Sequence, residues 1–153
     1  MNKKEILKIA FYTLLPIILG SIVGFAVKDD YEYIESLNKV INIPTIVFPI
    51  VWSILYILMG IWSYLYDHEY PEDNMTLSIY WISLFVNLLF SPLLFIFEQN
   101  VLATIDVVVL IVMVGYLFWK TLKNNNKFAY LLLPYLLWLF TALTLMIDIL
   151  IHN

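Results

Sequence analysis

The sequence predicts an all-α integral membrane protein, a single domain over residues 1–153 that folds as a bundle of five transmembrane helices. Of its residues, 63% are hydrophobic and only 13% are charged, and the mean hydropathy is +0.88. These values lie far outside the range of soluble globular domains. One crossing needs about 20 mainly apolar residues, and five separate segments meet that length. The predicted spans are 9–27, 48–66, 77–97, 101–119 and 128–151.

The composition also narrows the classes of function. The sequence has no cysteine, which excludes disulfides, thiol nucleophiles and Cys-ligated metals, and it has only two histidines. A net charge of −4 without a basic block argues against a nucleic-acid partner. The acidic connection at 67–76 holds His68 among four carboxylates. We interpret it as solvated surface, and we assign no metal site.

The first span, 9–27, follows three lysines, as a cleaved leader would. It is longer than the apolar part of most leaders, and no convincing small-x-small cleavage site follows it. We therefore interpret it as a membrane helix. Pro16 is expected to bend this helix. Gly20 and Gly24 form a small-xxx-small pair that favours close helix contact, either within the chain or, less often, between two copies.

A polar, acidic connection of about 20 residues, 28–47, follows the first span. Segments of this length without a helix or strand pattern are often lids over a site, although a solvated linker is equally compatible. Pro44 and Pro49 mark the entry to the second span. In that span Trp52, Tyr56 and Met59 share one helical face. The polar groups of tryptophan and tyrosine rings find no partner among lipid tails. We therefore expect the helical face that carries these three residues to face a ligand.

Each of the last three spans contains a polar or acidic residue within its apolar sequence. Asn87 lies near the middle of the third span, where a buried amide needs a hydrogen-bond partner, and Pro92 is expected to kink that helix. In the fourth span Asp106 is expected to face the interior, either near its own helix's N-terminal amides or in a ligand or proton role. Asp148, near the end of the fifth span, is expected to be hydrated at the interface.

The distribution of lysines predicts the orientation. Six lysines fall on the side of the N-terminus and two fall on the other side. The positive-inside rule then places the N-terminus in the cytoplasm and the C-terminus outside.

Motifs on several spans resemble those of the TspO/MBR family, which includes the translocator proteins and the tryptophan-rich sensory proteins. The family's second-span signature is matched by Pro44, Phe48, Pro49, Trp52, Leu55, Tyr56, Met59 and Gly60. Its elements elsewhere are matched by Gly20, Gly24, Leu37, Lys39, Asn87, Ser91, Pro92, Phe95, Asp106, Pro134, Tyr135, Leu136, Trp138, Ala142 and Asn153. The resemblance covers most of the chain.

Four positions depart from the family pattern, namely Tyr33, Ser83, Phe90 and Met146. No tyrosine follows Tyr135 and no lysine or arginine follows Lys127, so the cholesterol-recognition pattern of animal members is not supported in the last helix. These features indicate a bacterial member in the cell membrane.

The resemblance implies a homodimeric five-helix bundle in the lipid bilayer whose pocket opens under the first connection. It implies binding of porphyrins, notably protoporphyrin IX, and of drug-like aromatic ligands such as isoquinoline carboxamides and benzodiazepines. No tightly bound cofactor is expected, and the scarcity of metal ligands favours a metal-free porphyrin. The expected binding residues are Tyr33, Pro44, Phe48, Trp52, Tyr56, Asn87, Phe90, Asp106, Tyr135, Trp138 and Ala142.

Three functions are compatible with this resemblance. The first is a porphyrin sensor or scavenger. The second is light-dependent breakdown of bound protoporphyrin IX, with Trp52 and Trp138 as photochemical partners. The third is transport of porphyrin or small lipids, although no repeat or unwound mid-helix signal supports it. An aromatic-rich bundle without a pocket is the alternative to all three, because Trp and Tyr also gather at membrane interfaces.

Overall fold

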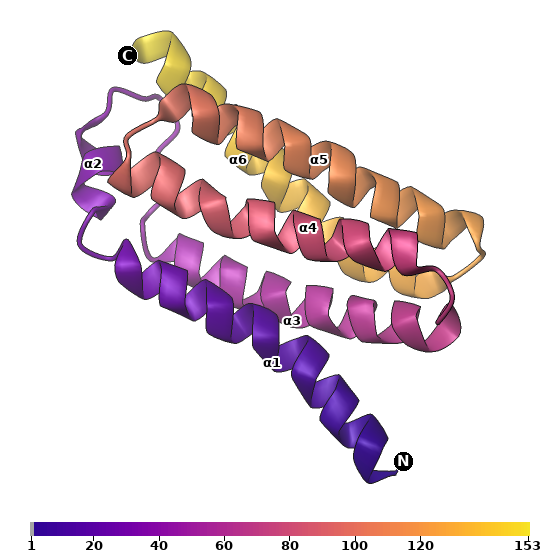
Figure 1. Ribbon diagram of the computed structural model, residues 1–153. Coiled ribbons are helices and arrows are strands. Elements are labelled where there is room, and N and C mark those ends of the chain that lie inside the picture. Colours follow the sequence, from indigo (N-terminus) through magenta and orange to yellow (C-terminus); the bar gives the residue numbers. More distant parts are fainter. Residues whose placement is uncertain (1) are drawn as a thin grey trace.

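A computed structural model describes residues 2–153, which contain helices and no strands (Figure 1). Five helical segments are long and apolar enough to cross a membrane, so the predicted all-α membrane bundle is confirmed. The helices are α1 (Lys3–Ala26), α2 (Tyr31–Ser36), α3 (Val47–Glu69), α4 (Asn74–Ser91), α5 (Asn100–Lys123) and α6 (Leu133–His152). A π-helical turn (Pro92–Ile96) extends α4, and a 3-10 helix (Lys127–Leu132) leads into α6.

Helices α1 and α4 begin before the predicted spans because polar residues cap them outside the apolar segments. The side chain of Asn2 accepts hydrogen bonds from the backbone N–H groups of Lys4 and Glu5, and the Glu5 carboxylate accepts one from Asn2 N–H. This capping box starts α1 at Lys3, ahead of its apolar core. Asp73 likewise caps α4 through Thr76 N–H, at 3.1 Å.

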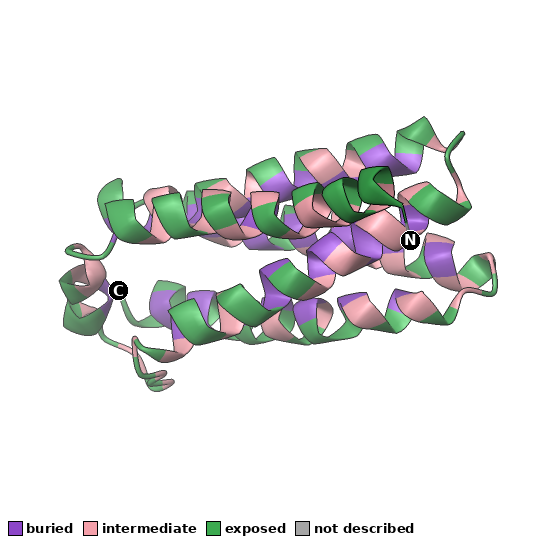
Figure 2. Cartoon of the chain, turned by 90° about the horizontal axis from the view of Figure 1, so that it is seen from below, coloured by how far each residue is buried: buried purple, intermediate pink, exposed green. Residues whose placement is uncertain are grey.

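The long helices form a closed ring. Around the bundle, α4 packs on α5, α5 on α6, the 3-10 helix before α6 on α3, α3 on α1, and α1 on α4. Exposed residues face outward and buried residues face the interior (Figure 2). Large apolar side chains such as Phe25, Phe85 and Val112 are exposed, as expected for surfaces that contact lipid.

Helix α1 is the least buried of the long helices, and Pro16 is its only buried residue. Its N-terminal part diverges from the other helices (Figure 1), in agreement with the bend expected at that proline. The close approach of α1 to α3 depends on Gly60. A Cβ there would lie 2.6 Å from both Thr13 Cα and Tyr12 O, so only glycine fits without a backbone shift.

The structure shows the local effects of Pro92, Gly20 and Gly24, for which the sequence predicted a kink and a close helix contact. Pro92 does change the local geometry, since Phe97 N–H bonds to its carbonyl oxygen, at 3.0 Å, in a π-helical turn. Gly20 packs within the chain, because a Cβ at this position would lie 2.1 Å from the ring of Tyr56. A Cβ at Gly24 would meet no atom within 4 Å, so Gly24 leaves open space instead of making a helix contact.

Candidate functional site: a cavity between α1, α3 and α4

A cavity of about 420 Å³ lies between α1, α3 and α4, in the half of the bundle nearest to α2. Its walls are mainly apolar and contain no carboxylate. The lining residues are Ile17, Gly20, Ser21, Val23, Gly24, Phe25, Lys28, Tyr31, Pro49, Trp52, Ser53, Tyr56, Asn87 and Ser91. The volume falls within the range of about 300–1,000 Å³ that is typical of small-molecule pockets.

The α1 wall is open where it carries Gly20, Ser21 and Gly24. The missing side chain of Gly24 leaves free space, and Gly20 lets the backbone of α1 lie directly on the ring of Tyr56. Ser21 and Phe25 are exposed, so the cavity reaches the surface of the bundle beside α1.

The α3 wall presents two stacked aromatic rings. Trp52 and Tyr56 are one helical turn apart, and their ring centroids lie 5.7 Å from each other with planes inclined by 27°. Trp52 and Tyr135 of α6 also meet edge to face, with ring centroids 6.0 Å apart and planes inclined by 74°. Contacts with both neighbours fix the orientation of the Trp52 ring in the cavity wall.

A buried hydrogen-bond network joins three helices at the base of the cavity. Tyr56 donates from its hydroxyl to Asn87 Oδ1 at 2.9 Å, and Asn87 Nδ2 donates to the Tyr135 hydroxyl oxygen at 2.8 Å. The predicted need of Asn87 for a partner is therefore met by α3 and α6. Because Asn87 also lines the cavity, its amide is a fixed polar group in an otherwise apolar wall.

Aromatic rings of the second and fifth crossings do converge, but they fill the space between those crossings. Trp138 meets Phe48 edge to face at 5.8 Å and 76°. Phe48, Phe90 and Ala142 belong to one buried apolar cluster, and none of them lines the cavity. Trp138 instead borders a shallow groove of about 310 Å³ between α3 and α6, where Ile54 and Leu137 are exposed.

The remaining predicted residues lie outside the cavity wall. Tyr33 joins α2 to the start of α5, because its hydroxyl accepts a hydrogen bond from Asn100 Nδ2 at 2.9 Å. Pro44 borders a second depression of about 300 Å³ beside Lys39 and Phe48. Asp106 is buried, as expected, and its Oδ2 has no hydrogen-bond partner among residues 2–153.

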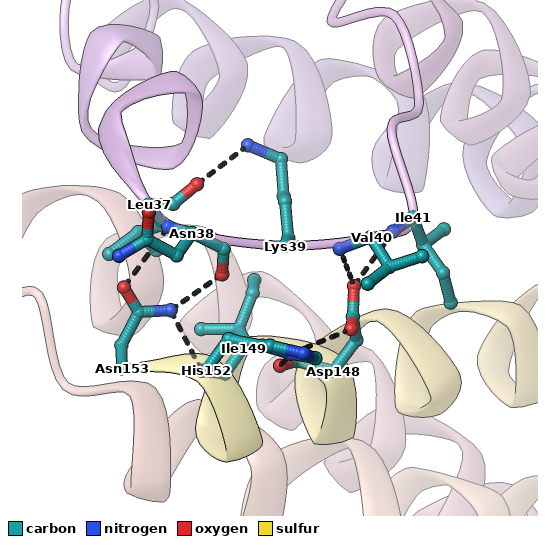
Figure 3. Close-up of polar contacts among 9 residues, drawn as sticks. All are labelled: Leu37, Asn38, Lys39, Val40, Ile41, Asp148, Ile149, His152 and Asn153. Carbon is teal, nitrogen blue, oxygen red and sulfur yellow. Dashed lines mark hydrogen bonds and ion pairs between the residues drawn. The ribbon is translucent and has the colours of Figure 1, made fainter.

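The first connection is held against the C-terminal end of α6 (Figure 3). Asp148 Oδ2 accepts hydrogen bonds from the N–H groups of Val40 and Ile41, both at 2.8 Å. Asn153 bonds to the backbone of Asn38 in both directions, with Nδ2 donating to its carbonyl at 2.7 Å and Oδ1 accepting from its N–H at 3.1 Å. The segment is thus ordered by specific contacts, and α2 at its start contacts the π-helical turn after α4.

The expectation that Asp148 is hydrated is corrected, since it is buried and bound to backbone amides. Helical spacing carries a signal for this role. Asp148 lies three residues after Leu145 and directly before Ile149, both of which are buried in α6. An acid on a buried face needs donors from another segment.

Comparison with known proteins agrees with this architecture. The sequence profile of the TspO/MBR family matches residues 12–151. The chain is 29% identical over 116 residues to a tryptophan-rich sensory protein from Cereibacter sphaeroides, covering 75% of this chain and 72% of that protein. It is 27% identical over 138 residues to a translocator protein homolog from Schizosaccharomyces pombe, covering 83% and 80%. With five membrane-spanning helices and a profile match over most of its length, the chain belongs to the TspO/MBR family.

Proposed function

We propose that this protein binds a porphyrin, with protoporphyrin IX as the first ligand to test, and acts in the membrane as a tetrapyrrole sensor or scavenger. One observation carries the proposal, which is the cavity of about 420 Å³ that presents the stacked rings of Trp52 and Tyr56. A porphyrin is flat, aromatic and largely apolar, so it gains area and stacking from such a wall. The family resemblance supplies the ligand class.

The polar groups of the cavity suit the same ligand. The Asn87 amide is held by Tyr56 and Tyr135, so it is an oriented group that needs no rearrangement on binding. The α1 wall of glycine and serine leaves room beside the rings. Isoquinoline carboxamides, which combine a flat ring system with an amide, are expected to compete for this cavity.

Titration of protoporphyrin IX into the protein in nanodiscs tests the proposal. Trp52→Leu removes the stacking face and is expected to weaken binding by about 1 kcal/mol or more, at least fivefold. Trp119→Leu is the matched control, because Trp119 is exposed on α5 and lies outside the cavity. Equal affinity of wild type and Trp52→Leu, or no saturable binding by wild type, contradicts the proposal.

A further variant in the same titration, Trp138→Leu, shows where the ligand binds. A ligand confined to the cavity leaves this variant close to wild type, because Trp138 borders the groove on the other side of α3. A loss as large as that of Trp52→Leu indicates that the ligand reaches between α3 and α6. That outcome keeps porphyrin binding but moves the site toward the residues expected from the family resemblance.

A further inference from the structure

The cavity holds one cationic side chain, and it lies at the end nearest to the membrane surface. Lys28 follows the C-terminal end of α1 and lines the cavity together with Tyr31 at the start of α2. Lys28 takes part in none of the three ion pairs found among residues 2–153. Its Nζ instead lies 4.9 Å from the ring centroid of Phe25, another cavity residue.

The polarity of the cavity changes along α1. Residues from Ile17 to Gly24 contribute only apolar and small side chains, and the cation comes one turn later. Ten helical residues from Ile17 to Ala26 rise about 14 Å. The α1 side of the cavity therefore offers a mainly apolar surface with a positive charge at the end nearest to the membrane surface.

Lys28 is the one charged residue that lines the cavity, and Asp29 and Asp30, which follow it in the chain, neither line the cavity nor form an ion pair with it among residues 2–153. No aspartate or glutamate lines the cavity, so its ammonium has no competing carboxylate in the wall. The Tyr31 hydroxyl makes no hydrogen bond within residues 2–153, while its ring is held edge to face against Phe95 at 4.8 Å. An ammonium and a phenol O–H together can donate to the two oxygens of one carboxylate.

We propose that Lys28, assisted by Tyr31, binds the carboxylate of a ligand whose apolar body lies along α1 in the cavity. This inference rests on the proposed function, since it uses the same cavity, and it defines the ligand as an apolar molecule with an acidic end. Both a porphyrin propionate and a fatty acid have that chemistry. The charge sets the direction of insertion, with the apolar body toward the middle of the bilayer and the acid toward its surface.

Comparison of acids with their neutral esters tests the role of Lys28. Binding of protoporphyrin IX and its dimethyl ester, and of palmitate and methyl palmitate, is measured for wild type, Lys28→Met and Tyr31→Phe. Lys127→Met is the matched control, because it removes the same charge at the opposite end of the bundle. Lys28→Met is expected to weaken the acid by about threefold to tenfold and leave its ester unchanged. Tyr31→Phe is expected to produce a smaller loss with the same selectivity.

Ester binding in the variants also reports that they are folded. An equal loss for acid and ester, or no loss for either, overturns the role of Lys28 while porphyrin binding by wild type stands. If palmitate but not protoporphyrin IX binds in a Lys28-dependent way, the carboxylate site stands and the proposed porphyrin function fails. If wild type binds none of the four compounds, both proposals fail.

Discussion

The two ends of the bundle are built differently. At the end formed by the connections 70–73 and 124–126, which we call the closed end, the interior is filled by aromatic rings. Trp62, Tyr66 and Tyr80 are at most 1% exposed, and the ring centroids of Tyr66 and Tyr80 lie 5.0 and 5.6 Å from that of Trp62. At the opposite end, which carries α2 and the cavity and which we call the cavity end, α1 contributes glycine and serine where large side chains would be needed to fill the space.

The difference shows how a membrane bundle can hold a cavity and remain folded. At the closed end, short connections join α3 to α4 and α5 to the 3-10 helix before α6, the interior is densely packed, and α1 lies against α3 at Gly60. The cavity end also has a buried apolar cluster, which includes Phe48 and Phe90, and it adds polar contacts in the Asn87 network and between the first connection and Asp148 and Asn153. Both ends are therefore packed, and the open space is confined to the side of the cavity end that α1 lines.

The largest expected effect comes from the helix contact that supports this arrangement. Gly60→Ala places a methyl group 2.6 Å from the backbone of Thr13 and Tyr12. Because neither neighbour is a flexible side chain, α1 must move, and we expect a loss of about 1–3 kcal/mol in unfolding free energy. Gly115→Ala is the control, since no atom lies within 4 Å of its Cβ position. Thermal unfolding in detergent measures both, and equal stability of the two variants contradicts this role of Gly60.

The next effect concerns the polar network under the cavity. Asn87→Leu leaves the hydroxyls of Tyr56 and Tyr135 without their partner, and we expect a cost of about 1–2 kcal/mol. Adding Tyr56→Phe and Tyr135→Phe removes the unpaired hydroxyls as well, so the triple variant should regain part of the stability. Denaturant unfolding of the single and triple variants measures the difference. A triple variant less stable than Asn87→Leu would show that the network is not the source of the cost.

A smaller and more local effect is expected where the first connection meets α6. Asp148→Ala removes the acceptor of Val40 and Ile41 N–H, so hydrogen exchange at these two amides should accelerate by about tenfold. The closed end should keep its protection. Thr144→Ala serves as control, because that exposed side chain bonds only within α6. Unchanged exchange at both amides in Asp148→Ala contradicts a role for Asp148 in holding the first connection.

Hydropathy was sufficient to predict the five spans, because the bilayer requires a long apolar segment for each crossing. Of the predicted stripe on α3, Trp52 and Tyr56 line the cavity, whereas Met59 is buried in the core outside the cavity wall. Spacing could not show whether a ring fills a space or borders one. Trp138 illustrates this limit, since the resemblance implied that it binds a ligand, whereas its ring packs on Phe48 outside the cavity wall.

Contacts between distant segments account for what the sequence did not reveal. Helix α2 has six residues and lacks an apolar repeat, and it is held from outside by the bond between Tyr33 and Asn100. Similarly, Asp148 is bound by two amides more than 100 positions earlier in the chain. One sequence indicates that an acid on a buried face needs donors, but it does not identify them.

The smallest expected effect is a pH dependence of the unfolding free energy that comes from Asp73 at the closed end. Burial acts to raise the pKa of this carboxyl, but hydrogen bonds from Thr76 and Tyr66 and the charge of Lys120 together hold the pKa below its ordinary value of 3.8. A carboxyl whose pKa is lower in the folded state than in the unfolded state stabilises the folded protein. This stabilisation is complete when the pH is above the unfolded-state pKa, and it is lost as the pH falls through the folded-state pKa. Asp73→Asn keeps a capping oxygen for Thr76 N–H but loses the charge, so we expect it to cost less than about 1 kcal/mol near pH 7.

Unfolding free energies measured between about pH 6 and pH 3 test this expectation. Wild type should lose stability below about pH 4 more steeply than Asp73→Asn, so the two curves converge at the acid end. Glu72→Gln is a suitable control, because Glu72 is exposed in the same connection and forms none of the ion pairs found among residues 2–153. Parallel curves for wild type and Asp73→Asn would mean that the Asp73 charge is not stabilising. The closed end would then depend on the packing of its aromatic rings and not on this charge, which would sharpen its contrast with the cavity end.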